Sequence, residues 1–283
     1  MTGVTLPAYA KLNLTLDVLR KRGDGYHDVA TIMQTVSLHD SVSVALADGD
    51  GIVCRCGDIP GDGSNLAVKA AAAFFAQTGI RQRGLRIDVD KRIPVGAGLA
   101  GGSADAAAVL RALRALLAPE LSHTELERIA AAVGSDVPFC IRGGTALAEG
   151  RGDRLAQLPP APRFRAVLCK PEFSVSTPLM FSRIRAEELS RRPDTAGMLD
   201  ALRRDEGQGV LARVRNVFED VLPDEYGEVF AIRDRLLALG AEAAAMSGSG
   251  PTVFGLFRGD AAAEAAYAAL KAAYAQTFLT RLV

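Results

Sequence analysis

A glycine-rich segment at residues 94–105, PVGAGLAGGSAD, constrains the fold more than any other feature of the 283-residue chain. It follows LRIDVD at 85–90, which alternates as a strand does, and it precedes an alanine-rich helical stretch at 104–118. Glycine lets the backbone approach a ligand closely, and a helix start offers free N–H groups and the positive end of its dipole. We expect Ser103 to cap this helix. The segment therefore predicts a strand-to-helix turn that binds an anion such as a phosphate.

This glycine pattern differs from the two commonest nucleotide-binding motifs, the dinucleotide fingerprint and the Walker loop. Gly96, Gly98 and Gly101 spell the dinucleotide fingerprint, which also requires a strand after the helix and an acidic residue about 20 positions on. Glu120 stands near that distance, but it lies between two predicted helices. The sequence also contains no G-x-x-x-x-G-K-[ST] pattern, so a Walker loop is excluded.

Composition and charge limit the partners of the chain. Its 33 lysines and arginines balance 33 aspartates and glutamates, so no net charge attracts nucleic acid or anionic lipid. No apolar run has the roughly 18 residues of a membrane span, and the N-terminus lacks the pattern of a signal peptide. The cysteines match no usual zinc pattern. We expect a cytoplasmic protein with no nucleic-acid or membrane partner, either a monomer or a weak homodimer.

The order of predicted elements favours an α+β protein with two domains. Residues 11–19 alternate strictly between apolar and polar side chains, as in a half-buried strand, and a helix is predicted at 66–78. The proline-rich segment 154–165 is predicted to be a linker. It would separate an N-terminal domain, residues 1–153, from a C-terminal domain, residues 164–283.

Three segments, in order along the chain, resemble the motifs of the galactokinase, homoserine kinase, mevalonate kinase and phosphomevalonate kinase superfamily. They are PAYAKLNLTLDV at 7–18, PVGAGLAGGSADAA at 94–107 and MSGSGPTVFGLF at 246–257. Residues 10–40 and 134–144 further resemble its diphosphocytidyl-methylerythritol kinase branch, in which the run GDGYH is specific. The resemblance implies an N-terminal ATP-binding α/β domain with a left-handed βαβ crossover and a C-terminal ferredoxin-like sandwich. It also implies an active site in the cleft between the two domains.

The resemblance implies a reaction and its catalytic residues. ATP, with Mg²⁺, would phosphorylate the 2-hydroxyl of a methylerythritol unit that carries a cytidine diphosphate, in the non-mevalonate isoprenoid pathway. Lys11 would contact the attacking hydroxyl and the transferred phosphoryl group, and Asp136 would be the catalytic base. Ser103 would reach the metal weakly, mostly through water and the ATP phosphates.

The other residues carried over from the resemblance form two sets. ATP would be bound by Pro94, Val95, Gly96, Ala97, Gly98, Leu99, Ala100, Gly101, Gly102, Ser103, Ala104 and Asn65. The acceptor would be bound by Asn13, Tyr26, His27, Thr177, Phe181, Ser247 and Gly248. In this set the rings of Tyr26 and Phe181 would stack on the base, and His27 would hydrogen-bond the cytosine edge. Ala100 and Ala104 depart from the family, which often has glycine and serine at these positions.

Several simpler interpretations remain open at this point. Asn65 is equally typical of a helix N-cap, Asp136 of a cap or turn, and Tyr26 and Phe181 of core packing. The chain could also be another small-molecule kinase of the superfamily, or a non-catalytic ligand sensor on the same fold. A sensor would be expected to lose the lysine–aspartate pair, which this chain retains.

Overall fold

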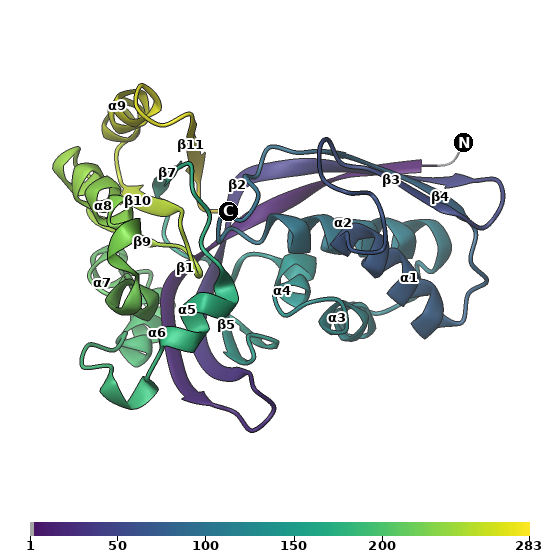
Figure 1. Cartoon of the computed structure of the whole chain (residues 1–283), viewed down its shortest axis with the longest axis horizontal. Coiled ribbons are helices and arrows are strands. Elements are labelled where there is room, and N and C mark those ends of the chain that lie inside the picture. The colour runs from purple at the N-terminus through teal and green to yellow at the C-terminus, as the bar shows by residue number, and fades with distance from the viewer. Residues whose placement is uncertain (1–2) are drawn as a thin grey trace. The chain divides into compact units, whose positions relative to one another are not determined.

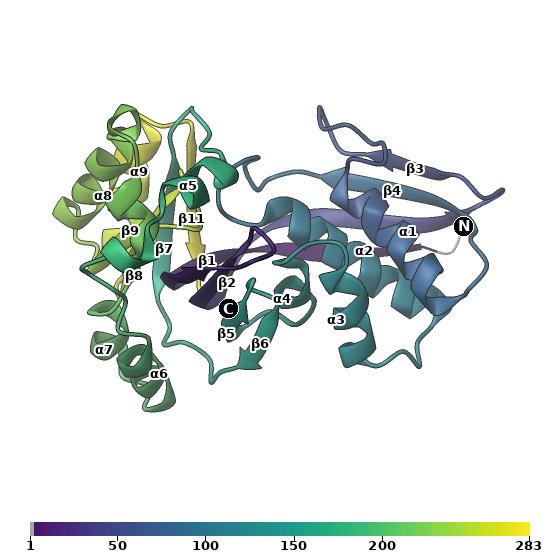
Figure 2. The same cartoon turned by 60° about the horizontal axis from the view of Figure 1, so that its bottom comes forward.

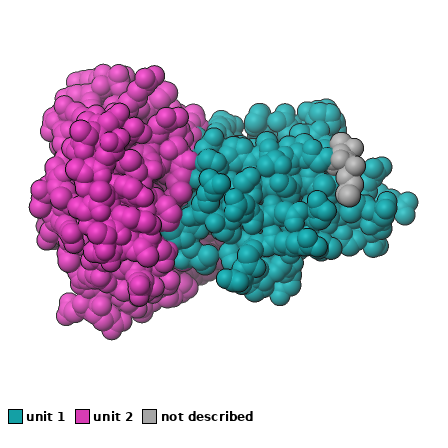
Figure 3. Space-filling view, turned by 90° about the horizontal axis from the view of Figure 1, so that it is seen from above, with its two compact units in different colours: residues 1–10, 39–95, 100–143 teal, residues 11–38, 96–99, 144–283 magenta. Residues whose placement is uncertain are grey.

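The computed structural model of the chain describes residues 3–283, which divide into two compact units (Figure 3). Unit 1 comprises residues 1–10, 39–95 and 100–143, and unit 2 comprises residues 11–38, 96–99 and 144–283. Two long strands, β1 (Gly3–Lys21) and β2 (His27–Ala47), supply residues to both units (Figure 1). The predicted domain limits at 153 and 164 stay a prediction, and the two units are described separately below.

Unit 1 contains a sheet built on the second half of β2. Residues Ser41–Ala47 pair antiparallel with β4 (Gly84–Asp90), and β3 (Ile52–Arg55) pairs parallel with β4. Val44 and Ile87 lie opposite each other in this register and are both buried, which is the alternation expected for a sheet with one covered face.

Four helices complete unit 1. They are α1 (Leu66–Thr78), α2 (Gly101–Leu117), α3 (His123–Ala131) and α4 (Val137–Arg142). Helix α2 packs against α1, α3 and α4 and is buried along most of its length. The side-chain oxygen of Asn65 caps α1 and left-handed Gly79 ends it, so the predicted helix 66–78 is confirmed. The Ser122 capping box starts α3.

A second sheet lies entirely in unit 2. Its strands are β7 (Arg165–Lys170), β9 (Ala243–Met246), β10 (Val253–Phe257) and β11 (Gln276–Arg281), antiparallel in the order β11-β7-β10-β9. Helix α8 (Glu228–Ala238) packs on β9 and β10, and α9 (Asp260–Lys271) packs on β7 and β11 (Figure 2). The chain order is thus β-α-β-β-α-β, and the predicted ferredoxin-like sandwich is confirmed.

The remaining elements of unit 2 lie outside this four-stranded sheet. They are β5 (Thr145–Gly150), β6 (Arg154–Gln157), α5 (Thr177–Arg183), η1 (Ala186–Glu188), α6 (Thr195–Arg203), α7 (Gly207–Leu211), β8 (Arg215–Asn216), η2 (Val217–Val221) and η3 (Asp224–Tyr226). Strand β5 pairs with the first half of β2 and with β6. The predicted linker 154–165 is therefore wrong in its first four residues, because a strand this short carries too few alternations to be recognised.

Candidate active site

The three motifs of the sequence meet at two residues of unit 2, Gly98 and Leu99. The backbone N–H of Lys11, in the first motif, donates to the carbonyl oxygen of Leu99 over 3.1 Å. The hydroxyl of Ser247, in the third motif, donates to the carbonyl oxygen of Gly98 over 3.0 Å. Segments more than 80 residues apart in sequence are thereby joined at the second motif.

Gly98 has no room for a side chain. Its φ is +72°, and a Cβ at this position would lie 2.2 Å from the carbonyl oxygen of Ser247. The contact is also tight from the other side, since a Cβ added at Gly248 would lie 3.0 Å from the carbonyl oxygen of Gly98. We call residues 94–103 the glycine loop and residues 246–250 the serine–glycine turn. The two segments touch backbone to backbone, which requires glycine at both positions.

The glycine loop ends at an unusual helix start. Ala100 is the N-cap of α2 and adopts the left-handed conformation, with φ of 58°, and no side chain caps the helix. The prediction that Ser103 is the cap is wrong, because the helix already begins at Gly101 and Ser103 lies in its first turn. The N–H groups of this first turn therefore have no side-chain cap, and they sit at the positive end of a 17-residue helix. This is the local chemistry of an anion site.

Three charged side chains, buried Asp40 and Asp105 and half-buried Lys91, hold the stem of the glycine loop, residues 91–93, in unit 1. The carboxylate of Asp40 accepts hydrogen bonds from the backbone N–H groups of Arg92 and Ile93, at 2.5 and 2.8 Å. The ammonium group of Lys91 donates to Asp40 over 2.5 Å and to Asp105, in α2, over 2.8 Å. We call Asp40, Lys91 and Asp105 the ionic clamp. It ties the chain just before Pro94 to the first turns of α2.

The ionic clamp carries one more negative than positive charge. Burial raises the pKa of Asp105 to about 7, against the opposing effect of Lys91, and the Oδ1 atom of Asp105 has no hydrogen-bond partner. Burial alone would lower the pKa of Lys91, but Asp105 and Asp40 together raise it above its ordinary value. Lys91 therefore stays charged at neutral pH, whereas the carboxylate of Asp105 takes up a proton as the pH falls through about 7.

Each proposed catalytic side chain has a defined local setting. In unit 2, buried Lys11 donates to the side-chain oxygen of Asn13 over 2.6 Å, and Asn13 donates to the hydroxyl of Thr31 over 2.8 Å. This chain of hydrogen bonds orients both Lys11 and Asn13. In unit 1, half-buried Asp136 stands at the N-cap position of α4, but its side chain makes no capping hydrogen bond. The interpretation of Asp136 as a helix cap is therefore not supported.

The GDGYH run forms the hairpin between β1 and β2. Tyr26 is 56% exposed, so its interpretation as a core residue is wrong, and the guanidinium of Arg151 lies 4.8 Å from the centre of its ring. The His27 ring stacks on Phe181 of α5, with ring centres 5.0 Å apart and 26° between planes. Phe181 in turn packs edge-on against buried Phe218. Phe181 thus belongs to the edge of the core and also faces the hairpin.

A cavity of about 290 Å³ opens beside this ring pair. It is lined by Lys21, His27, Ile184, Arg185, Ala186 and Glu187. Burial lowers the pKa of His27, and nearby Lys21 lowers it further. The imidazole is therefore neutral at neutral pH and offers one donor and one acceptor.

Two further predicted residues have contacts that define their surroundings. The hydroxyls of Thr177 and Ser249 are 2.6 Å apart, which places Thr177 beside the serine–glycine turn. The Asn65 side chain accepts from the Ala67 N–H and donates to the carbonyl oxygen of Pro60. The cap interpretation of Asn65 is confirmed, and its contact with adenine stays a prediction.

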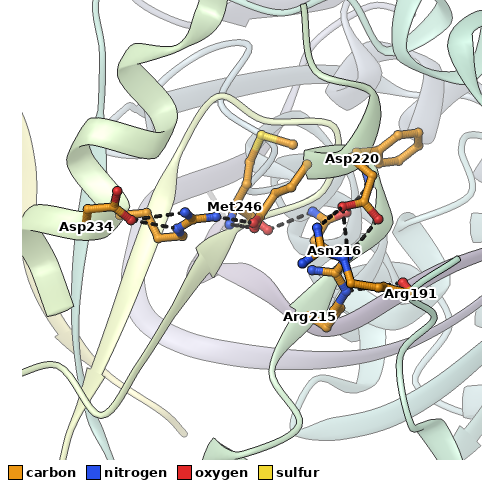
Figure 4. Close-up of polar contacts among 9 residues, drawn as sticks. Arg191, Arg215, Asn216, Asp220, Asp234 and Met246 are labelled. Carbon is orange, nitrogen blue, oxygen red and sulfur yellow. Dashed lines mark hydrogen bonds and ion pairs between the residues drawn. The ribbon is translucent and has the colours of Figure 1, made fainter. Parts of the chain in front are cut away.

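Sequence reasoning missed two groups that support these loops. Lys91 lies three residues before Pro94, the first residue of the glycine loop, in a chain whose basic residues are mostly arginine, and this bias could have revealed it. Asn216 donates to two carbonyl oxygens of the serine–glycine turn, one of them that of Met246, which Figure 4 shows. No sequence signal reveals Asn216, because its partners lie about 30 residues downstream.

The described residues contain neither a group of side chains arranged for a metal ion nor a helix suited to a membrane. Among residues 3–283, no group of three or more histidine, cysteine, aspartate or glutamate side chains is arranged to hold a metal ion. No helix in this range is long and apolar enough to cross a membrane.

Comparisons with known proteins agree with these motifs. The family model described as "GHMP kinases N terminal domain" matches residues 65–144, and that described as "GHMP kinases C terminal" matches residues 188–276. A 4-diphosphocytidyl-2-C-methyl-D-erythritol kinase from Brevibacillus brevis is 44% identical over 99% of this chain and 96% of its own. A crystal structure of 4-(cytidine 5'-diphospho)-2C-methyl-D-erythritol kinase has a TM-score of 0.84 at 36% identity, covering 99% of both chains.

A more distant structure shares the fold alone. Homoserine kinase from Cytophaga hutchinsonii gives a TM-score of 0.76 at 18% identity, over 100% of this chain and 95% of its own. The predicted two-domain kinase fold and the predicted superfamily are thereby confirmed. The chain belongs to the GHMP kinase family, in the branch formed by the 4-diphosphocytidyl-2-C-methyl-D-erythritol kinases.

Proposed function

We propose that this kinase transfers the γ-phosphoryl group of ATP to the 2-hydroxyl of 4-diphosphocytidyl-2-C-methyl-D-erythritol, a step of the non-mevalonate isoprenoid pathway. The single observation that carries the proposal is the meeting of the three motifs at Gly98 and Leu99. The names of the full-length relatives support the choice of acceptor. The GDGYH hairpin and its neutral histidine support a cytidine-bearing substrate.

In the proposed step, Asp136 takes the proton of the 2-hydroxyl as its oxygen bonds to the γ-phosphorus. The bond from the γ-phosphorus to the bridging oxygen of ATP breaks, and ADP leaves with that oxygen. Because phosphoryl transfer passes through a loose transition state, the proton leaves late and a well-placed carboxylate suffices as base. Most of the rate enhancement would then come from positioning and from charge stabilisation.

The glycine loop would hold the triphosphate with backbone N–H groups from Gly96 to Ser103. Gly96 and Gly98 adopt positive φ where the chain turns, and the first turn of α2 offers N–H groups without a side-chain cap, which suit an anion. The ammonium group of Lys11 would share the charge on the transferred phosphoryl group, in an orientation set by Asn13. Both contributions are strongest in the transition state, where negative charge spreads over the equatorial oxygens.

The chain fits a Mg²⁺ ion that arrives with ATP better than one held by a protein cage. No carboxylate cluster is arranged for a metal within residues 3–283, and the half-buried hydroxyl of Ser103 lies in the first turn of α2. Mg²⁺ commonly keeps several waters and binds through substrate phosphates. When bound, the ion would neutralise phosphate charge, with Ser103 as the protein group nearest to its water shell.

The cytidine end would lie at the His27 cavity. A neutral imidazole presents one donor and one acceptor, which matches the donor and acceptor atoms of the cytosine edge. Exposed Tyr26 offers a ring for stacking, and Lys21 and Arg185 place positive charge at the cavity for an anionic diphosphate. Thr177 would contact the diphosphate or the polyol.

We further propose that the enzyme acts in the cytoplasm as a monomer or weak homodimer. Analytical ultracentrifugation of the purified protein tests the oligomeric state.

An ADP-release assay with a panel of acceptors tests the function. Diphosphocytidyl-methylerythritol, mevalonate and homoserine are each supplied with ATP and Mg²⁺, and we expect turnover only with the first. The Asp136→Asn variant should bind ATP normally and lose turnover by about 10²-fold or more, the size expected when a general base is removed. Signal with mevalonate or homoserine alone would reject the acceptor, and wild-type turnover by Asp136→Asn would reject the base.

A further inference from the structure

Asn216 directs its whole side chain into the backbone of unit 2. It is fully buried at the end of β8, and its amide nitrogen donates to the carbonyl oxygen of Met246 over 2.7 Å (Figure 4). The same nitrogen donates to the carbonyl oxygen of Gly248 over 2.8 Å. Its amide oxygen accepts from the N–H of Phe218 over 3.0 Å. Both donors and the acceptor oxygen of the amide are thus used, and two of the three bonds hold the serine–glycine turn.

Glu219 holds the other polar group of Met246. One carboxylate oxygen of Glu219 accepts from the Met246 N–H over 2.8 Å, and the other accepts from the guanidinium of Arg233 over 3.1 Å. Nearby, Arg215 forms two hydrogen bonds to Asp220, at 2.8 and 2.6 Å, which fixes the segment that carries Asn216 and Glu219. The N–H and the carbonyl of Met246 are therefore both tied to residues 216–219.

The turn that these side chains hold is the one that contacts the glycine loop. Ser247 donates its N–H to Thr252 and its hydroxyl to the oxygen of Gly98, and its own carbonyl oxygen leaves no room for a Cβ at Gly98. The Oγ–O distance at Gly98 is 3.0 Å. A small shift of the turn would thus remove the hydrogen bond or push the carbonyl oxygen of Ser247 against the backbone of Gly98.

We propose that Asn216 is a positioning residue for phosphoryl transfer, which acts by fixing the serine–glycine turn against Gly98 of the glycine loop. The proposal rests on the function proposed above and adds a residue that touches neither ATP nor the acceptor. It also explains why an amide is needed. A carboxylate cannot donate to two carbonyl oxygens, and a serine hydroxyl has a single proton to donate.

The test combines kinetics, ligand binding and a double-mutant cycle. In Asn216→Ala, the carbonyls of Met246 and Gly248 lose their donors, and kcat/KM for ATP should fall by up to about 10²-fold through misplacement of the loop. The affinity for a non-hydrolysable ATP analogue, measured by calorimetry, should fall with it. If Asn216 acts through Ser247, the losses of Asn216→Ala and Ser247→Ala should not add in the double variant.

Leu270→Ala is the matched control for a general loss of stability. Leu270 is fully buried in the same unit on α9, which packs on β7 and β11, and its side chain has no polar group that could hold the serine–glycine turn. We expect a lower Tm but an unchanged kcat/KM for ATP. Equal kinetic losses in Asn216→Ala and Leu270→Ala, or additive losses with Ser247→Ala, would overturn the proposal.

Glu219→Gln gives a second, milder test in case Asn216→Ala does not fold. The glutamine oxygen can still accept from the Met246 N–H, though more weakly than a carboxylate, so kcat/KM for ATP should fall less than in Glu219→Ala. No difference between these two variants and the wild type would overturn the proposal. A wild-type protein that does not bind the ATP analogue would instead reject the proposed function, so the two failures are distinguishable.

Discussion

The two ends of the glycine loop are supported by opposite kinds of chemistry. In unit 1, the stem is held by the ionic clamp, in which Lys91 lies between two buried carboxylates. In unit 2, the tip at Gly98 is held by the serine–glycine turn, which depends on the neutral amide of Asn216. The stem therefore depends on the balance of charges and hence on pH, whereas Asn216 holds the turn by neutral hydrogen bonds that depend on geometry, beside the charged pair of Glu219 and Arg233.

The largest loss of stability is expected when the positive charge of Lys91 is removed from the ionic clamp. Lys91→Met would leave Asp40 and Asp105 buried without a counter-charge, and we expect unfolding to become easier by about 3–5 kcal/mol. Chemical denaturation measures the loss. The control is Arg86→Met in β4, whose ion pair with Asp88 is exposed on both sides and should cost less than about 1 kcal/mol. Similar losses in the two variants would contradict the role of the ionic clamp.

A methyl group at the tip should be the next largest effect. In Gly98→Ala the new Cβ would meet the Ser247 oxygen in a backbone region unfavourable to alanine, and overpacking of this kind costs about 1–3 kcal/mol. Gly102→Ala is the control, since its Cβ would make only an ordinary contact with Leu66, and its stability should change by less than about 1 kcal/mol. Thermal unfolding measures the Tm of both variants, and an unchanged Tm for Gly98→Ala would disprove the close contact.

Asp105, in the stem, should make the stability of the protein depend on pH. The pKa of Asp105 is about 7 in the folded protein against an ordinary value of 3.8, so between these values the folded state binds the extra proton. Stability should therefore fall as pH rises from about 4 to about 7, by at most about 1.4 kcal/mol per pH unit, and level off above that range.

Asp105→Asn removes this titration and should flatten the curve of Tm against pH. The matched control is Asp88→Asn, which changes an exposed carboxylate in the same unit and should leave the slope unchanged. Parallel curves for the wild type and Asp105→Asn would show that this carboxylate is not the source of the pH dependence.

The smallest expected effect lies where the glycine loop enters α2. Ala100 adopts a left-handed conformation that disfavours alanine by about 1–2 kcal/mol. Ala100→Gly should therefore raise Tm slightly, after the greater flexibility of glycine in the unfolded chain is subtracted. Ala104→Gly, four residues on in regular helix, should instead lower stability by about 1 kcal/mol. Changes of the same sign would contradict strain at Ala100.

The sequence predicts elements well where local chemistry marks their ends. Helix α1 has a cap at Asn65 and a glycine stop at Gly79, and its predicted bounds match the structure. The start of α2 was missed by three residues, because a left-handed alanine and two glycines replace the polar cap that marks most helix starts. Similarly, β6 is too short to carry a period.

The candidate site likewise contains parts that the sequence predicts and parts that it does not. The glycine loop, the GDGYH hairpin and the serine–glycine turn are contiguous motifs and could be predicted. The ionic clamp and Asn216 could not, because their partners are far apart in sequence and each side chain alone is ordinary. The division of β1 and β2 between two units also leaves no local mark in either strand.

A crystal structure with a non-hydrolysable ATP analogue would show whether the glycine loop binds the triphosphate. We expect phosphate oxygens within about 3.2 Å of backbone nitrogens between Gly96 and Ser103. We also expect the terminal phosphorus within reach of the side chains of Lys11 and Asp136. An analogue bound elsewhere, with these amides facing only solvent, would contradict this expectation.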